Sequence, residues 1–153
     1  MNYWNQKILR EQLDAKLNLL KPFAAVSLEK GWIKTIREAL GMSTKQLASK
    51  VGIDQSRISR LENAETENDL KLSSLKKIAE GLGMKFVYGF VPKESLESMV
   101  QEQARKIAMR RLAKVSHTMK LEDQELSEAQ KANALDDLIQ RILIEEPKNF
   151  WDK

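Results

Sequence analysis

The sequence predicts a mainly all-α fold, on three observations. Apolar residues recur at helical spacing over most of the 153 residues, which indicates amphipathic helices. Gly, Pro and helix-capping residues such as Ser and Asp fall between these stretches and mark where helices begin and end. Only residues 84–91 are instead rich in β-branched and aromatic side chains, and they predict one short strand.

The first helix is predicted at residues 3–20 and ends before Pro22, because proline disrupts a helix. The second is predicted at residues 28–40 and is stopped by Gly41. Their apolar stripes consist of Trp4, Ile8, Leu13, Leu17 and Leu20 in the first helix and Trp32, Ile33, Ile36, Ala39 and Leu40 in the second.

The next three helices are predicted at residues 44–51, 55–63 and 73–82. Ser43 precedes the first of them, and Gln46 follows three residues later, which is the pattern of a capping box. Asp54 is the expected N-cap of the second. Gly52 and Gly83 end the first and the third helix.

The predicted strand at residues 84–91 reads MKFVYGFV and ends at Pro92. A single strand cannot satisfy its own backbone hydrogen-bonding groups, and no other strand is evident in the sequence. The simplest partner is the same strand of a second subunit, which would make the protein a homodimer; the alternative is that the segment lies against its own helices.

The last two helices are predicted at residues 93–119 and 127–144 and differ in charge. Residues 84–120 contain 8 basic and 3 acidic residues (+5), whereas residues 121–153 contain 4 and 9 (−5). The basic residues could contact DNA phosphates or pair with the acidic ones, and we favour pairing because both are present in similar number. The residues concerned are Arg105, Lys106, Arg110, Arg111 and Lys114 on one side and Glu122, Glu125, Asp136 and Asp137 on the other.

The composition excludes several kinds of chemistry. The chain has no Cys and a single His, His117, so disulfides, thiolate metal sites and Cys nucleophiles are ruled out. No catalytic constellation is evident, and we expect no enzyme, no metal site and no cofactor. The apolar runs are far shorter than the ~20 residues that span a bilayer, and no signal peptide opens the chain, so we expect a cytoplasmic protein.

Residues 43–63, STKQLASKVGIDQSRISRLEN, have the spacing of a helix-turn-helix. Ala48 is small enough for the two helices to approach closely, and Gly52 permits the positive φ of the turn. The second helix would present Gln55, Ser56, Arg57, Ser59 and Arg60, whose amide, hydroxyl and guanidinium groups read base edges and phosphates. The alternative is an αα-hairpin without a role in DNA binding. The apolar residues expected to bury between the helices are Leu47, Val51, Ile58 and Leu61.

This segment resembles the Cro/C1-type (XRE) helix-turn-helix family over about residues 28–83, which implies a five-helix domain. Thr44, Gln55 and Ser56 match family positions that contact DNA. Lys45, Arg57 and Arg60 match positions that contact bases or phosphates more variably, and Glu62 matches a structural acidic residue. Where the family often has Gly two residues after that acidic residue, this chain has Ala64.

Further resemblances cover the rest of the chain. Residues 72–91, LSSLKKIAEGLGMKFVYGFV, are similar to HipB-type antitoxins, in which a C-terminal strand pairs across the dimer. Residues 31–48, 91–108 and 116–124 resemble mobile mystery protein A. That family implies an antitoxin and autorepressor with a Fic-domain partner protein.

We therefore expect four parts: an N-terminal helical arm (1–24), a helix-turn-helix DNA-binding domain (25–83), a dimerisation strand (84–92) and a C-terminal helical extension (93–153). The expected function is that of a dimeric, sequence-specific transcriptional repressor that binds a palindromic operator in double-stranded DNA. It would autoregulate an operon shared with a Fic-domain, toxin-like partner. The alternative is an antitoxin whose main role is to bind and neutralise a partner protein, with DNA binding secondary.

Overall fold

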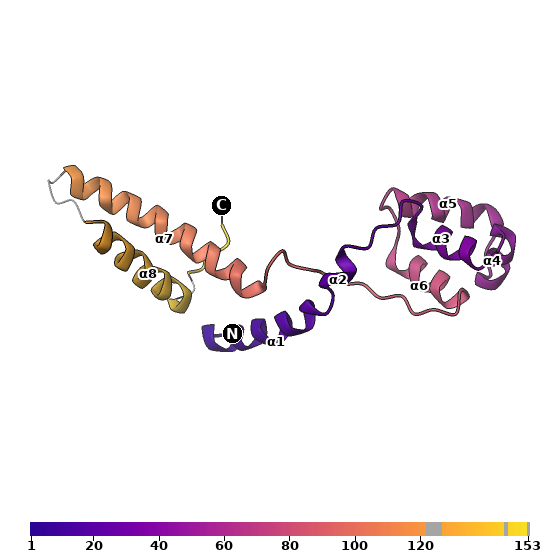
Figure 1. The fold of residues 1–153 in the computed structure, drawn as a ribbon, viewed down its shortest axis with the longest axis horizontal. Coiled ribbons are helices and arrows are strands. Elements are labelled where there is room, and N and C mark those ends of the chain that lie inside the picture. Colours follow the sequence, from indigo (N-terminus) through magenta and orange to yellow (C-terminus); the bar gives the residue numbers. More distant parts are fainter. Residues whose placement is uncertain (122–126, 146, 153) are drawn as a thin grey trace. The chain divides into compact units, whose positions relative to one another are not determined.

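The computed structural model describes residues 1–121, 127–145 and 147–152, and within them the chain is mainly α-helical (Figure 1). The chain divides into two compact units. Residues 1–21 and 91–153 form the first unit, and residues 22–90 form the second. The all-α prediction is therefore confirmed for the described residues.

The described residues contain eight helices. Their bounds are α1 (Tyr3–Asn18), α2 (Lys21–Ala24), α3 (Gly31–Ala39), α4 (Thr44–Val51), α5 (Gln55–Thr66), α6 (Leu72–Gly81), α7 (Leu96–Leu121) and α8 (Glu128–Glu145). Seven of them lie where helices were predicted, and only the short α2 was not anticipated.

Two details of the predicted architecture are wrong. Residues 28–83 hold four helices, α3–α6, rather than the five that the family resemblance implied. Each of the four stretches of helical apolar spacing in this range forms one helix, and turns and loops connect them. The described residues also contain no strand at 84–91. A strand requires hydrogen bonds to a neighbouring strand, and no described part of the chain supplies one.

The second unit packs α3–α6 around a single apolar core. Leu47, Val51 and Ile58 are buried there as predicted, whereas Leu61 is half-buried at its edge. The buried residues of this core are Ile33, Leu47, Ala48, Val51, Ile58 and Ile78. Because α4 and α5 bury their apolar faces in this core, their polar faces are left to solvent.

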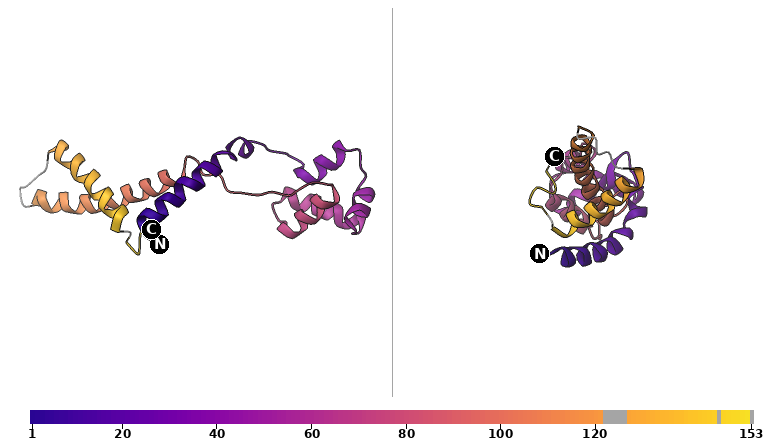
Figure 2. Two further views of the ribbon diagram at one scale, coloured as in Figure 1. Left: turned by 90° about the horizontal axis from the view of Figure 1, so that it is seen from below. Right: turned by 90° about the vertical axis from the view of Figure 1, so that its left-hand side faces the viewer.

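The first unit packs α7 against α8, and α1 packs against both (Figure 1, Figure 2). Ala104 and Ala108 are fully buried on α7, and their small side chains allow the helix axes to approach closely. The buried residues of this second core are Tyr3, Ala104, Ile107, Ala108, Ile142 and Leu143.

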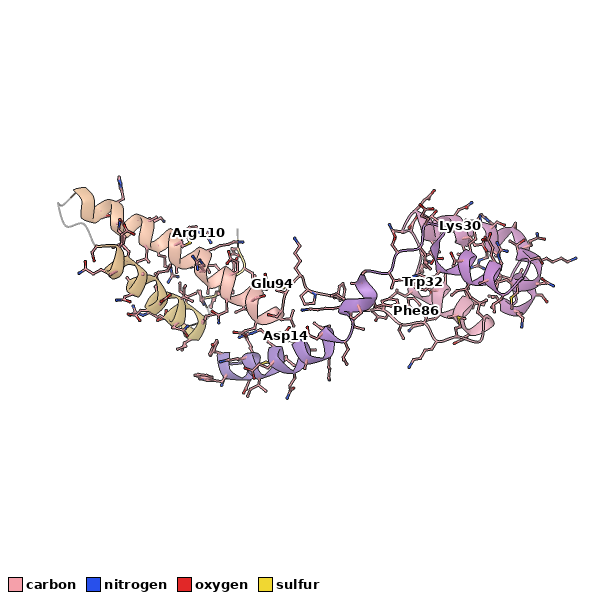
Figure 3. All side chains as sticks on the ribbon, viewed as in Figure 1. Asp14, Lys30, Trp32, Phe86, Glu94 and Arg110 are labelled. Carbon is pink, nitrogen blue, oxygen red and sulfur yellow. The ribbon has the colours of Figure 1, made fainter. Side chains whose placement is uncertain are left out.

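Polar contacts attach α1 to the start of α7. The carboxylate of Asp14, which is labelled in Figure 3, accepts hydrogen bonds from the backbone N–H groups of Leu96 (2.7 Å) and Glu97 (3.2 Å). It therefore acts as an N-cap supplied by another helix. Arg10 forms an ion pair of 2.7 Å with Glu97. Burial raises the pKa of Glu97, but hydrogen bonds from Gln101 and Arg10 outweigh this effect and lower the pKa below its usual value.

The favoured pairing between the basic residues of α7 and the acidic residues that follow is not seen in the described part of the chain. No ion pair there joins the five basic residues at positions 105–114 to Asp136 or Asp137. Glu122 and Glu125 lie outside the described residues.

Candidate nucleic-acid interface

The first helix of the motif, α4, begins with the capping box that the sequence predicts. The backbone N–H of Gln46 donates to Oγ of Ser43 (3.1 Å), and the backbone N–H of Ser43 donates to Oε1 of Gln46 (2.8 Å). These two bonds satisfy donors that a helix start otherwise leaves unpaired. The start of α4, where Thr44 and Lys45 lie, is therefore well defined.

The turn between α4 and α5 depends on Gly52. Its φ of +78° and ψ of +36° lie in the left-handed region, which a residue with a Cβ enters only at a cost. The backbone N–H groups of Gly52 and Ile53 both donate to the carbonyl oxygen of Ala48, at 2.8 Å and 3.1 Å. The chain then enters α5 after Asp54, which occupies the N-cap position as predicted but forms no side-chain capping bond.

The polar residues predicted to contact DNA lie mainly on exposed surface. Ile58 and Glu62, one turn apart on α5, face inward and are buried. Thr44 is half-buried at the first turn of α4. The exposed predicted residues are Lys45, Gln55, Ser56, Arg57, Ser59 and Arg60.

One direct contact joins two of the predicted residues. Nε2 of Gln55 donates a hydrogen bond of 2.8 Å to Oγ1 of Thr44. The bond connects the first residue of α4 to the first residue of α5. It fixes the Gln55 amide in one orientation and leaves its carbonyl oxygen and second N–H available.

A buried ion pair holds α5 against α3. The guanidinium of Arg37 donates to both carboxylate oxygens of Glu62, at 2.5 Å from Nε and 3.3 Å from Nη2, and Nη1 donates to the carbonyl oxygen of Met42 (2.8 Å). The Arg37 and Glu62 side chains are only 11% and 6% exposed. The hydrogen bond to Glu62, against the opposing effect of burial, raises the pKa of Arg37 above its usual value. The structural role expected of Glu62 agrees with this geometry.

A second contact ties the end of α5 to the start of α3. No side chain next to α3 in the sequence caps it, and the Glu65 carboxylate accepts hydrogen bonds from the backbone N–H groups of Trp32 (2.6 Å) and Ile33 (3.0 Å) instead. Gly31 has a φ of +77°, and a Cβ on it would lie 2.9 Å from the Glu65 carboxylate. The absence of a side chain at Gly31 therefore leaves room for the Glu65 carboxylate to cap α3.

Sequence reasoning did not identify Arg37 or Glu65. Arg37 lies four residues after Ile33, so it falls on the buried face of α3, and a charge at that position signals a buried partner. For Glu65 the sequence gives no such signal, because Ser27, an ordinary capping residue, directly precedes the helix predicted at 28–40. Only the structure shows that α3 begins at Gly31, with no side-chain cap from Lys30.

Within residues 1–121, 127–145 and 147–152, no group of three or more His, Asp or Glu side chains is placed to hold a metal ion. In the same residues no helix is both long and apolar enough to cross a membrane.

The geometry defines a helix-turn-helix whose second helix presents polar and basic side chains, as in DNA-binding regulators. Residues 33–88, which are 56 of the 153 residues, match the model of a helix-turn-helix family of DNA-binding regulatory domains. The match supports a regulator of the XRE (Cro/C1) type. No curated protein and no solved structure matches the chain.

Proposed function

We propose that the protein is a sequence-specific transcriptional repressor that binds a palindromic DNA operator as a dimer. The observation that carries the proposal is the exposed polar face of α5, with the Gln55 amide held by Thr44 at its start. In helix-turn-helix proteins the N-terminal residues of the second helix contact base edges in the major groove.

The bond to Thr44 suggests which base Gln55 would read. With one N–H engaged, the amide offers one donor and one acceptor side by side. Adenine presents the complementary pair in the major groove, the N7 acceptor and the N6 amino donor. We expect Gln55 to select adenine at one position of each half-site.

The remaining exposed residues would position the helix on the duplex. Arg57, Arg60 and Lys45 carry charges that suit phosphate oxygens, and the hydroxyls of Ser56 and Ser59 suit either phosphates or bases. Binding that depends on such contacts weakens steeply as salt rises.

Dimerisation through residues 84–92 accounts for the exposed apolar side chains of this segment. Val87 and Tyr88 are exposed, and Phe90 is 84% exposed. The segment also has no strand partner in the described residues, so pairing with the same segment of a second copy would cover both its side chains and its backbone. A two-fold dimer would then place half-sites ~34 Å apart, or a multiple of that distance.

A binding-site selection with wild-type protein and the Gln55→Ala variant tests the proposal. We expect the variant to lose about 1–3 kcal/mol of discrimination at one adenine of each half-site and to keep its other preferences. Lys45→Ala should weaken binding to all sequences alike. Asn63→Ala removes another exposed amide from α5 and serves as the matched control. An unchanged base preference in Gln55→Ala would contradict the assignment.

The alternative is an antitoxin whose main role is to neutralise a partner protein. The first unit favours it, because it is compact, separate from the helix-turn-helix and carries exposed apolar side chains such as Trp4, Ile8 and Trp151. The resemblance to mobile mystery protein A suggests a Fic-domain partner encoded in the same operon. If Trp4→Ser with Ile8→Ser abolishes co-purification with that partner and leaves operator binding intact, the two functions reside in different units.

A further inference from the structure

The outward face of α7 carries a row of positive charge that the proposed function does not use. Between Glu102 and Leu121 the helix contains no acidic residue. Five basic residues of this stretch are exposed: Arg105, Lys106, Arg110, Arg111 and Lys114. The lone histidine, His117, is also exposed and lies three residues after Lys114.

The packing of α7 determines which side of the helix the basic side chains face. Ala104, Ile107 and Ala108 are buried in the core shared with α8. Lys106, Arg110 and Lys114 follow at intervals of four residues and therefore lie roughly in line along the helix, about 6 Å apart. Arg110, labelled in Figure 3, is the middle residue of this basic row.

No ion pair in the described residues joins a carboxylate to the basic row, although Glu102 lies one turn before Lys106. Ion pairs in the described residues engage other basic side chains, and Asp136 and Asp137 are exposed on α8 without a bond to α7. Asp152 lines a shallow hollow together with Lys106 and Arg110 but forms no ion pair with either.

We propose that the basic row Lys106, Arg110 and Lys114 binds the phosphodiester backbone of double-stranded DNA outside the bases that α5 reads. The inference rests on the proposed function, because it assigns a second contact to the same DNA. The contact is independent of sequence, since phosphates carry no base identity. It would extend the footprint beyond the palindrome.

The composition of the row favours DNA over an acidic protein as the partner. Protein interfaces have an apolar centre enriched in aromatic residues, Met and Arg and depleted of Lys. Two of the three members of the row are lysines, and residues 105–116 contain no aromatic residue. A linear polyanion instead binds such a row by releasing its condensed counterions.

The test measures affinity against salt concentration on two duplexes with the full-length protein. The short duplex contains only the selected palindrome, and the long duplex adds about one helical turn on each side. The test variant replaces the row: Lys106→Gln, Arg110→Gln and Lys114→Gln. The matched control removes the same charge from exposed lysines elsewhere in the first unit: Lys16→Gln, Lys93→Gln and Lys148→Gln. Far-UV circular dichroism confirms that both variants keep wild-type helicity.

On the long duplex we expect the slope of log K against log salt to be less steep by about 2–3 in the test variant, at ~0.9 for each lost phosphate contact. The control variant should keep the wild-type slope. On the short duplex all three proteins should agree. Equal slopes for wild type and test variant on the long duplex overturn the inference. It is also overturned if the test variant binds DNA as wild type does but no longer binds an acidic protein.

A scrambled long duplex separates this inference from the proposed function. If wild-type protein does not prefer the palindrome over the scrambled duplex, the proposed function fails. A slope difference between wild type and test variant on the scrambled duplex still supports the backbone contact in that case. If no slope difference occurs on either long duplex, the inference fails whatever the sequence preference.

Discussion

Replacing Arg37 by methionine should destabilise the second unit severely. The substitution keeps an unbranched side chain of similar length but removes the guanidinium that pairs with Glu62. The Glu62 carboxylate, 6% exposed, would then be a buried charge without a counterion. Because Glu62 lies on α5, the loss acts on the helix that we expect to read DNA.

The magnitude follows from the contacts of Arg37. Its guanidinium makes two hydrogen bonds to Glu62 and one to the carbonyl oxygen of Met42. Hydrogen bonds to charged groups contribute roughly 1.5–3 kcal/mol each, and removal of one member of a buried pair costs about 3–5 kcal/mol. We therefore expect the free energy of unfolding to fall by about 3–5 kcal/mol, most of the stability of a small unit.

The double variant Arg37→Met with Glu62→Met is the matched control. With both charges absent, no uncompensated carboxylate remains, and replacement of a buried pair by apolar residues is often neutral. Urea unfolding followed by tryptophan fluorescence measures the double variant and the two single variants, Arg37→Met and Glu62→Met. A Trp4→Phe, Trp151→Phe background leaves Trp32 as the only tryptophan, so the signal reports on the second unit.

The double variant should recover most of the stability that the single variant loses. A loss of less than about 1 kcal/mol in Arg37→Met would refute the reasoning, because it would place the pair in the range of exposed ion pairs. So would a double variant as unstable as the sum of the two single variants, since no coupling would then exist between the charges.

Three further predictions concern packing, capping and pH. A Cβ on Gly81 would lie 2.5 Å from Cγ2 of Val51, so Gly81→Ala should lower the urea midpoint of the second unit by the equivalent of about 1–3 kcal/mol; an unchanged midpoint would show that α4 and α6 separate freely. Asp14→Ala should cost about 0.5–2 kcal/mol and speed amide exchange in the first turn of α7, whereas exchange in α5 stays as in wild type. Burial raises the pKa of Glu97, but hydrogen bonds from Gln101 and Arg10 outweigh burial and lower it. The ionised Glu97 therefore stabilises the first unit above about pH 4.3, the usual glutamate value. This stabilisation is lost as pH falls through the lowered pKa. The unfolding midpoint of wild type should therefore fall more steeply than that of Glu97→Gln between pH 5 and about pH 3; parallel curves would contradict the assignment.

Local signals explain why most helices were predicted well. The predicted helix at residues 44–51 has the bounds of α4 in the structure. Its start is determined by Ser43 and Gln46 and its end by Gly52, and each of these residues lies within one turn of the end that it determines. Such signals act through neighbours in the chain, so they are legible without knowledge of the fold.

Long-range contacts were beyond sequence reasoning for the opposite reason. The carboxylates that cap α3 and α7 come from Glu65 and Asp14, which are 32 and 82 residues from the amides they bind. No periodicity or neighbouring residue indicates such a pair. The bond between Thr44 and Gln55 likewise depends on how two helix starts meet in space, although both residues were expected in the site.

The strand prediction was wrong for a related reason. Residues 84–91 have the composition of a strand, but β-propensity describes how side chains fit a sheet and does not supply the sheet. Within the described chain no second strand is present. The composition of residues 84–91 therefore indicates a preference for extended structure, but no strand forms because the described chain offers no strand to pair with.

The connectivity of the two units has a consequence for protein engineering. The helix-turn-helix unit is an insertion, because the other unit is built from residues on both sides of it, 1–21 and 91–153. A graft of a helix-turn-helix with another operator preference would need two junctions, near residues 21 and 91. A deletion of α1 would leave all four helices α3–α6 in place and instead expose the start of α7, some 80 residues further along the chain.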